Sequence, residues 1–251
     1  MATAPRLSID LSALCENWQK LAIKSGTAKT SAVVKANGYG LGIEPVVEAL
    51  SMNGCDTFFV ATVDEGIRTR LILPNAKIFV LNGIFPETLA ETLSNKLIPV
   101  LCSIEQIQLW AKNAPGTPSA IHVDTGMTRS GLTLAEAETL AKDTELLRAT
   151  GGFMVMSHLA CGDEPADPLN ETQLARFQSI ADQFLGFQKS FANSAGIVLG
   201  SGYHVDLTRP GISIYGGEAT NDVPNPSKQV VKAEARILQI RDAKAGDTVG
   251  Y

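Results

Sequence analysis

The sequence has few cysteines, and they are not grouped as metal ligands or disulfide partners usually are. There are four, widely separated, with no Cys-x-x-Cys pair and no Cys/His cluster: Cys15, Cys55, Cys102 and Cys161. This pattern argues against a zinc site and against a disulfide framework. We therefore expect free thiols, no bound metal and a reducing, cytoplasmic compartment.

Long apolar runs and excess positive charge are also missing. No stretch approaches the roughly 18 apolar residues of a membrane-spanning helix, and the N-terminal segment MATAPRLSID has one arginine and no apolar core. We therefore expect neither a transmembrane helix nor a secretory signal. The formal net charge of −5 disfavours nucleic acid or an anionic membrane as partner.

Short apolar runs alternate with helical patterns along most of the 251 residues. Continuous apolar runs, unlike strict alternation, predict strands that are buried on both faces. The expected strands are Ala32–Val34, Phe58–Val60, Ile78–Leu81, Ile98–Leu101, Ala120–Val123, Phe153–Met156, a weaker run Ser190–Ala192, and Gly211–Tyr215. Eight such units predict an α/β fold with a (β/α)8 barrel over residues 1–227, and a doubly wound open sheet is the alternative.

Helix starts can be recognised between these runs. Three segments fit a capping box, in which two backbone N–H groups are satisfied reciprocally: Thr62–Glu65, Ser103–Gln106 and Thr133–Glu136. Asp167-Pro168 and Glu44-Pro45 fit a cap followed by proline at the first helical position. Ile43, Val46, Val47 and Leu50 repeat as one apolar helix face.

The last part of the chain has a different pattern. Residues 220–228 form a polar, proline-bearing linker, and residues 230–240 then alternate like a strand with one wet face. Lys244–Asp247 indicates a turn, and Thr248–Tyr251 the start of another strand. We expect a second, β-rich domain to begin near residue 228 and to be cut off at residue 251, with residues 1–10 as a candidate strand of the same domain.

Polar residues follow four of the expected strands at the end where barrel enzymes carry their chemistry. They are Lys35, His158, Asn193-Ser194, and Arg209 ahead of Pro210-Gly211. Ser194, Gly211 and Ile212 lie beside strands seven and eight, the usual phosphate site of such barrels. Together with Arg129, which follows a glycine-bearing loop, they predict an anion site with a lysine and two arginines on one face.

Each of these residues has a structural alternative. Lysine shifts its pKa readily when desolvated, which suits Schiff-base chemistry at Lys35, yet spacing alone favours a lysine whose stem covers apolar surface at the barrel rim. Arg129 is suited to donate to an anionic oxygen or to lie on the surface. His158 is suited to stack on a flat ligand or to be hydrogen-bonded within the fold.

Several segments in series resemble the alanine racemases. Val33–Gly42 is similar to the cofactor-lysine signature of that family, and His122–Gly131 to its second signature. Further matching segments follow in order over essentially the whole chain: Met156–Ala160, Asn170-x-x-Gln173-x-x-x-Phe177, Ala192–Ala195 and Arg209–Gly216.

The resemblance implies a barrel that binds pyridoxal 5'-phosphate and interconverts L-alanine and D-alanine, supplying D-alanine for cell-wall peptidoglycan. It implies that Lys35 forms the Schiff base with the cofactor and acts as base on the D-alanine side. Tyr39, Ser194, Gly211 and Ile212 would hold the phosphate. His158 would pack on the pyridine ring, Arg209 would face its nitrogen, and Arg129 would bind the phenolic oxygen near the substrate carboxylate.

The resemblance also implies a head-to-tail homodimer in which a tyrosine of the partner's C-terminal β domain is the second base. That tyrosine would follow Tyr251, so we expect this chain to lack it and to be inactive alone. The family's usual modified lysine is replaced by His122, which leaves the positioning of Arg129 open. The alternatives are a non-catalytic cofactor carrier, a basic amino-acid decarboxylase, or a serine or broad-specificity racemase of the same fold.

Overall fold

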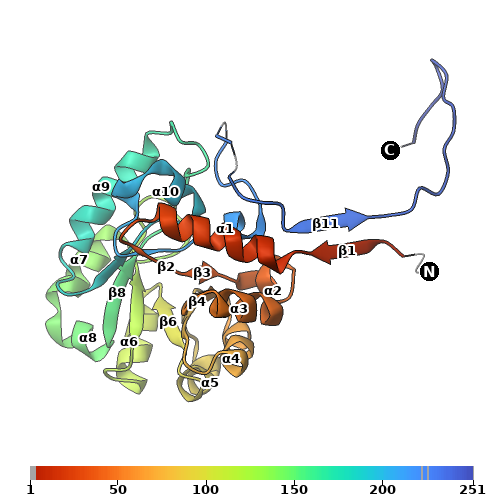
Figure 1. The fold of residues 1–251 in the computed structure, drawn as a ribbon. Helices are drawn as coiled ribbons and strands as arrows, with labels where there is room; N and C mark the ends of the chain where they lie inside the picture. The colour runs from red at the N-terminus through yellow and green to blue at the C-terminus, as the bar shows by residue number, and fades with distance from the viewer. Residues whose placement is uncertain (1–3, 222, 225, 251) are drawn as a thin grey trace.

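A ring of short parallel strands forms the centre of the molecule, and helices cover its outer side (Figure 1). The computed structural model describes residues 4–221, 223–224 and 226–250. Within them, seven strands are hydrogen-bonded side by side in chain order from β3 to β9. These are β3 (Ala32–Val33), β4 (Thr57–Val60), β5 (Lys77–Val80), β6 (Ile98–Leu101), β7 (Ser119–His122), β8 (Gly152–Met156) and β9 (Gln188–Ser190).

The ring is closed by an eighth strand. β2 (Lys29–Thr30), which leads into β3, pairs in parallel with β10 (Leu207–Thr208). On its other side the β10 segment bonds to the chain around β9, since Arg209 N–H donates to the Ala192 carbonyl over 2.8 Å. Val33 N–H donates to the Pro210 carbonyl over 2.9 Å. Backbone hydrogen bonds therefore run around the whole ring, which confirms the predicted barrel and excludes the open sheet.

Helices follow the strands in the order expected for repeated β/α units. The longer ones are α1 (Leu11–Lys24), α3 (Ile43–Met52), α4 (Val63–Ile72), α6 (Ile104–Asn113), α7 (Leu134–Lys142) and α9 (Leu169–Ala181). The shorter helices and 3-10 turns are α2 (Lys35–Tyr39), α5 (Leu89–Ser94), α8 (Thr144–Ala149), α10 (Ser194–Leu199), η1 (Pro86–Thr88), η2 (Ser201–Tyr203) and η3 (Ile212–Tyr215). Among the described helices none is long and apolar enough to cross a membrane.

The continuous apolar character of the strands has a direct structural cause. Successive side chains of a strand point to opposite faces, and here both faces are buried. Side chains of one parity fill the barrel interior: Val33, Phe59, Phe79, Ile98, Val100, Ala120, Met154, Met156 and Leu207. Side chains of the other parity, such as Phe58, Val80 and Val155, pack against the helices.

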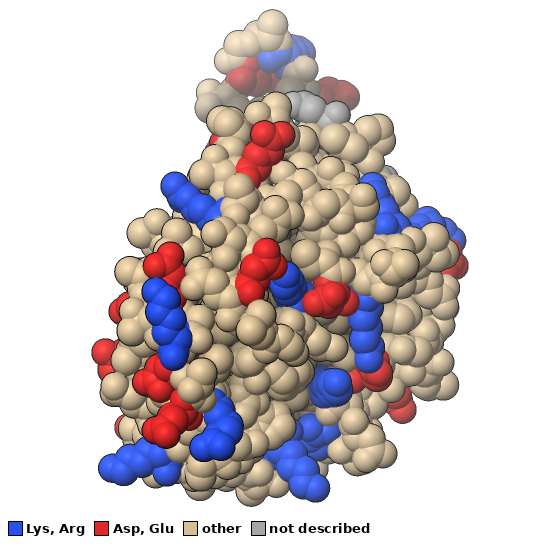
Figure 2. Space-filling model, turned by 90° about the vertical axis from the view of Figure 1, so that its left-hand side faces the viewer, with Lys and Arg blue, Asp and Glu red and all other residues tan. Residues whose placement is uncertain are grey.

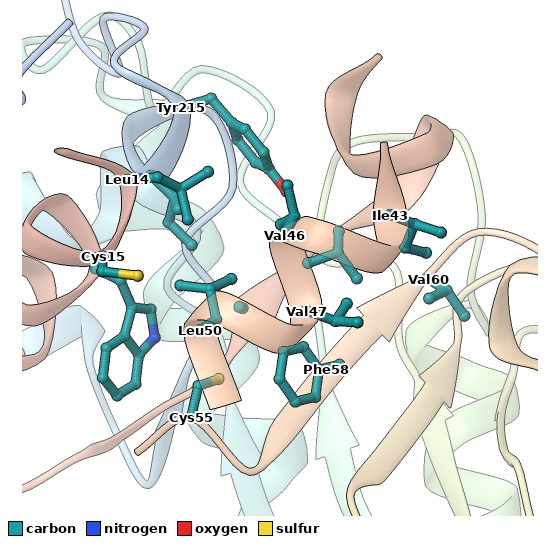
Figure 3. Close-up of a cluster of buried hydrophobic side chains, with 14 of the residues drawn as sticks. Leu14, Cys15, Ile43, Val46, Val47, Leu50, Cys55, Phe58, Val60 and Tyr215 are labelled. Carbon is teal, nitrogen blue, oxygen red and sulfur yellow. The ribbon is translucent and has the colours of Figure 1, made fainter. Parts of the chain in front are cut away.

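One such outer layer lies between α1, α3 and β4 (Figure 3). Ile43, Val46, Val47 and Leu50 are fully buried there, as their spacing predicts. The helix begins at Ile43 with Gly42 as its N-cap residue. Pro45 is therefore not at the first helical position but two residues later, within the first turn. Its missing N–H is tolerated there, because the N–H groups of the first turn have no partner within the helix.

The three predicted capping boxes differ in completeness. Thr133 and Glu136 form the full reciprocal pair. At Thr62 and Ser103 the hydroxyl caps the helix as predicted. The side chain three residues later, however, accepts from the N–H of the residue before the N-cap and not from that of the N-cap itself. Glu65 accepts from Ala61 N–H over 2.8 Å, and Gln106 accepts from Cys102 N–H over 2.9 Å. These two side chains thus fix the strand end as well as the helix.

The prediction of a strand over Gly211–Tyr215 is wrong. The eighth strand is β10, and Ile212–Tyr215 forms the 3-10 turn η3. Proline has no N–H to continue a ladder, and Pro210 directly follows the β10 segment. The apolar residues Ile214 and Tyr215 are buried in the outer layer that includes α1, so their hydrophobicity reflects helix contact rather than sheet membership.

Two segments near the ends of the chain pair with each other outside the barrel. β1 (Arg6–Ile9) pairs antiparallel with β11 (Val231–Glu234), and this ribbon extends away from the helices (Figure 1). The strand predicted over residues 230–240 stops at Glu234 because its partner begins at Arg6. Residues 235–250 form no helix or strand; the predicted turn is closed by Asp247 N–H on the Lys244 carbonyl over 3.0 Å. Of the predicted segments, residues 1–3, 222, 225 and 251 lie outside the described residues.

Charges are mixed on the face drawn in Figure 2, where lysine and arginine side chains are interspersed with aspartate and glutamate. Among the described residues, oppositely charged side chains also form ion pairs, including Lys29 with Asp56 and Arg68 with Glu44. A basic stripe of the kind that tracks a nucleic-acid backbone is not seen on this face.

A buried hydroxyl cluster stabilises the closure of the ring, and its removal should be measurable. Thr208 on β10 is fully buried and its Oγ1 lies 3.0 Å from Ser25 Oγ and 3.1 Å from Thr30 Oγ1. We expect Thr208→Val to lower the free energy of unfolding by about 1–2 kcal/mol, because the buried Thr30 hydroxyl loses its donor and Ser25 Oγ keeps only its bond to the Leu21 carbonyl. Urea unfolding measures this, and exposed Thr139→Val should stay within about 0.5 kcal/mol; equal losses would contradict the assignment.

Candidate active site

Along each strand every second side chain points into the barrel, and the side chains at the barrel mouth follow the same alternation. Leu207 points into the barrel, and Arg209 follows two residues later on the same side. By the same two-residue period, Lys35 follows Val33, His122 follows Ala120 and His158 follows Met156. The strands therefore bring together four titratable groups that are far apart in sequence.

These groups line one cavity of about 530 Å³, a size typical of small-molecule sites. All eight residues predicted from the sequence to form the site contribute to its lining: Lys35, Tyr39, Arg129, His158, Ser194, Arg209, Gly211 and Ile212. His122 lines it too, together with the acidic side chains Asp163 and Glu218. The cavity thus carries three cationic side chains and two acidic ones.

The chain after Lys35 adopts an unusual backbone conformation. Ala36, Asn37, Gly38 and Tyr39 all have positive φ, between 53° and 64°. For residues with a Cβ this left-handed conformation costs roughly 1–2 kcal/mol each. Gly38 N–H donates to the Val34 carbonyl over 2.9 Å and Gly40 N–H to the Ala36 carbonyl over 2.8 Å. The segment is thus a strained left-handed turn that directs Lys35 and Tyr39 into the cavity.

Side chains from two helices hold this turn in place. Glu65 accepts from Asn37 N–H with one carboxylate oxygen and from Ala61 N–H with the other, each over 2.8 Å. Asn37 Oδ1 accepts from Arg68 over 2.8 Å, and Arg68 also pairs with Glu44 through two hydrogen bonds. Strained backbone persists only where surrounding contacts over-determine it, and this network supplies those contacts.

The environment of Lys35 favours its neutral form more than water does. Burial lowers the pKa of the Lys35 ammonium most, the nearby Arg129 lowers it further, and Glu65 acts in the opposite direction. Desolvation and a neighbouring cation are the two effects that make an amine nucleophilic.

Tyr39 is fixed by stacking. Its ring lies 4.4 Å from that of Tyr215, whose hydroxyl donates to the Val33 carbonyl over 3.2 Å. The Tyr39 hydroxyl packs against Gly211, where a Cβ would come within 2.3 Å of the oxygen. Glycine at position 211 is therefore required by close approach, and it keeps a polar hydroxyl at this side of the cavity.

Ser194 connects α10 with the turn after β10. Its Oγ accepts from Gly211 N–H over 2.9 Å and from Ser213 N–H over 3.4 Å. The hydroxyl hydrogen of Ser194 and the N–H of Ile212 remain as donors, whereas the Gly211 N–H is already used. All three were predicted as anion ligands; here the Gly211 N–H is bonded to Ser194, and the missing Cβ leaves room for the Tyr39 hydroxyl.

Arg209 is buried against backbone acceptors. Its guanidinium donates to Ser190 Oγ, to the Ser157 carbonyl and to the Phe191 carbonyl, and it lies 5.9 Å from the centre of the Phe59 ring. Burial lowers the pKa of Arg209 to about 9, so it is cationic at neutral pH. This fixed charge, after the larger effect of burial, depresses the pKa of both mouth histidines, to about 3 for His158 and about 4 for His122.

Arg129 is carried by a loop that Asp124 organises. Asp124 Oδ1 accepts from three successive N–H groups, those of Gly126, Met127 and Thr128, over 2.8–3.2 Å. Among the described residues no hydrogen bond joins His122 to Arg129; the His122 Nδ1 lies 3.8 Å from the thiol sulfur of Cys102. Arg129 is thus positioned by the backbone of its own loop.

Three contributions were not recognised from the sequence: the Glu65–Asn37–Arg68 network, the stacking of Tyr215, and the contacts of Gln173 described below. Glu65 was noticed only as a capping residue and Gln173 only as part of a motif. Their partners are backbone groups of distant segments, which no local pattern reveals.

The comparisons with known proteins identify one family. The model for the N-terminal domain of alanine racemase matches residues 9–219. The biosynthetic alanine racemase of Agrobacterium fabrum is 49% identical over 249 residues, covering 98% of this chain and 64% of its own length. The alanine racemase of Rhizobium meliloti is 44% identical over 254 residues, covering 100% and 67%. The chain thus spans about two thirds of the length of these relatives.

Solved structures agree with these matches. The alanine racemase of Bartonella henselae, with covalently bound pyridoxal phosphate, has a TM-score of 0.90 at 38% identity and covers 96% of this chain and 72% of its own. The biosynthetic alanine racemase of Pseudomonas aeruginosa has a TM-score of 0.91 at 30% identity, covering 100% and 71%.

The strained turn predicts an unusual stability effect. Ala36 is exposed and has a φ of 53°, so its methyl group adds strain with little packing. We expect Ala36→Gly to raise the free energy of unfolding by about 1 kcal/mol. Ala175→Gly, in an exposed interior position of α9, should lower it by about 1 kcal/mol. Chemical denaturation of both variants measures the contrast, and destabilisation by both would disprove the strain.

The mouth histidines predict a pH dependence of stability. An unfolded chain binds a proton on His158 near its ordinary pKa of 6.5, whereas the folded protein binds it only near pH 3. Stability should therefore fall as pH drops from about 6.5, by up to about 1.4 kcal/mol per pH unit for this residue. Urea unfolding between pH 7 and pH 4 should show a shallower slope for His158→Gln than for wild type. Equal slopes would refute a neutral His158.

Proposed function

The chain belongs to the alanine racemase family, and from that membership we propose that the protein interconverts L-alanine and D-alanine with pyridoxal 5'-phosphate as cofactor. The observation that carries this proposal is the convergence of all eight site residues predicted from the sequence on one cavity at the barrel mouth. The site geometry adds to the family likeness, because residues that are far apart in the sequence line the same cavity of this chain.

The residues present fit such a cofactor. The cavity volume of about 530 Å³ suits a small phosphorylated ring compound. Three cationic side chains and the donors at Ser194 and Ile212 suit an anion. The close packing of the Tyr39 hydroxyl on Gly211 keeps this side of the cavity open and polar.

We assign the holding groups as follows. Lys35 Nζ would hold the cofactor covalently, and Tyr39, Ser194 and Ile212 would donate to its phosphate, with Gly211 giving them room. His158, neutral because of its lowered pKa, would lie on the ring without adding charge. Arg209 would donate to the ring nitrogen, since a guanidinium can only donate. Arg129 would bind the phenolic oxygen and the substrate carboxylate.

Racemisation requires that the α-proton of alanine leave from one face and return on the other. A bound pyridoxal cofactor supplies the electron withdrawal that stabilises negative charge at the α-carbon. Lys35 Nζ, when free, is suited to take or return the proton on its own face, because burial and Arg129 favour its neutral form. Arg209 is cationic at neutral pH and would disfavour protonation of the ring nitrogen that it faces. The ring would then withdraw electrons less strongly, which would favour rapid return of the proton over other fates of the amino acid.

A second group must act on the opposite face, and we propose a tyrosine for it, as the family resemblance implies. Tyr39 is unsuited, because its hydroxyl packs against Gly211 and its ring is stacked on Tyr215. The proposal extends to a homodimer whose partner supplies this tyrosine, to a role in making D-alanine for the cell wall, and to residues 228–251 as part of a β-rich domain. Pairing of β11 with β1 outside the barrel supports that last assignment.

The decisive experiment traps the cofactor on its lysine. Incubation with pyridoxal phosphate should give an absorbance band at the edge of the visible range, and borohydride should then fix the label on Lys35, identified by peptide mapping. Lys35→Ala should abolish the label and, in a chain that carries the second base, lower L- to D-alanine conversion about 10²–10⁴-fold. Exposed Lys112→Ala serves as the matched control and should retain both.

The outcomes separate the competing functions. Label on Lys35 with racemisation of alanine supports the proposal, and faster turnover of serine or release of CO2 would instead support a related enzyme of this fold. Label without any turnover, in a chain that carries the second base, would support a non-catalytic carrier. Absence of label on a folded protein would disprove the cofactor assignment.

A further inference from the structure

A buried glutamine behind the cavity connects two of its loops. Gln173 lies on the inner face of α9 and is fully buried, beside the apolar residues Phe177 and Ile180. It does not line the cavity, but it contacts the loops that carry His158 and Arg129. Burying an amide among apolar side chains costs free energy unless each of its polar atoms is hydrogen-bonded. The hydrogen-bond partners of Gln173 therefore indicate its role.

Two hydrogen bonds of Gln173 go to the backbone of the His158 loop. Its Oε1 accepts from Ala160 N–H over 2.8 Å, and its Nε2 donates to the His158 carbonyl over 3.0 Å. An N–H can only donate and a carbonyl can only accept, so these partners fix the orientation of the amide. The side chain thus clamps the backbone that sets where the His158 ring lies.

The same amide reaches the neighbouring loop. Nε2 also lies 3.3 Å from Thr125 Oγ1, which is 2.8 Å from Ser157 Oγ. The Ser157 carbonyl in turn accepts from the Arg209 guanidinium. From the next turn of α9, Arg176 donates to the Thr125 carbonyl over 3.1 Å. Helix α9 therefore holds the start of the Arg129 loop and the His158 loop against each other.

We propose that Gln173 is a positioning residue: it fixes the His158 loop relative to the Arg129 loop so that both side chains meet one ligand in the cavity. The identity of that ligand rests on the proposed function, whereas the coupling of the loops does not. An apolar residue at position 173 would pack equally well beside Phe177 and Ile180. It would leave the Ala160 N–H and the His158 carbonyl without their partner.

The test replaces the amide by an apolar side chain of similar size. Gln173→Met should speed amide hydrogen exchange at residues 125–130 and 158–160 of the cofactor-free protein and weaken pyridoxal phosphate binding about 10-fold, as expected for unpaired buried groups. Gln178→Met, at an exposed position of the same helix, should change neither by more than about 2-fold. Unchanged exchange in a folded Gln173→Met protein would overturn the proposal.

A double-mutant cycle separates positioning from general destabilisation. If Gln173 acts through His158, Gln173→Met should cost much less cofactor affinity in a His158→Ala background than in wild type. The same loss in both backgrounds would assign Gln173 a structural role only. If Gln173→Met does not fold, Thr125→Val removes a single link and should still speed exchange at 158–160; no change would overturn the proposal.

Failure of the proposed function would look different. If the wild-type chain does not bind pyridoxal phosphate, the cofactor assignment fails, but the exchange comparison needs no ligand and still decides whether Gln173 couples the loops. Faster exchange with unaltered cofactor affinity would show that the loops are linked without positioning the ligand groups, and it would refute the proposal.

Discussion

Backbone hydrogen bonds between residues 206–210 and the two neighbouring strands close the barrel, and the site depends on this closure. Once the ring is closed, every strand must present alternate side chains to its interior. The inward parity then determines which residue of each strand end faces the mouth. Lys35, His122, His158 and Arg209 meet there because Val33, Ala120, Met156 and Leu207 fill the layer beneath them.

The mouth combines concentrated positive charge with uncharged histidines. Arg209 keeps its charge although it is buried, because carbonyl and hydroxyl oxygens solvate it. That charge and burial together hold His122 and His158 neutral. The cavity can therefore attract an anion through its lysine and arginines, without protonation of the histidines. Burial and Arg129 lower the pKa of Lys35, which favours its neutral, nucleophilic form.

Much of the fold could be predicted from the sequence, and the errors have physical causes. Buried strands appear as apolar runs, so seven of the eight were recognised, and the helix face of Ile43, Val46, Val47 and Leu50 followed from its period. The run Gly211–Tyr215 was misassigned because residues packed on a helix and residues packed in a sheet are equally apolar. The strand after Val230 ended early because its length depends on a distant partner, β1.

The sequence by itself determined which residues we propose for the chemistry: a lysine, two arginines, a histidine and a serine at strand ends, within motifs that resemble one family. Only the tertiary structure decided how they are held. The left-handed turn after Lys35 depends on Glu65 and Arg68, the Tyr39 ring on Tyr215, and the His158 loop on Gln173. These contacts join residues that are 15 to 176 positions apart, and local patterns in a sequence report only on neighbours within a few turns of chain.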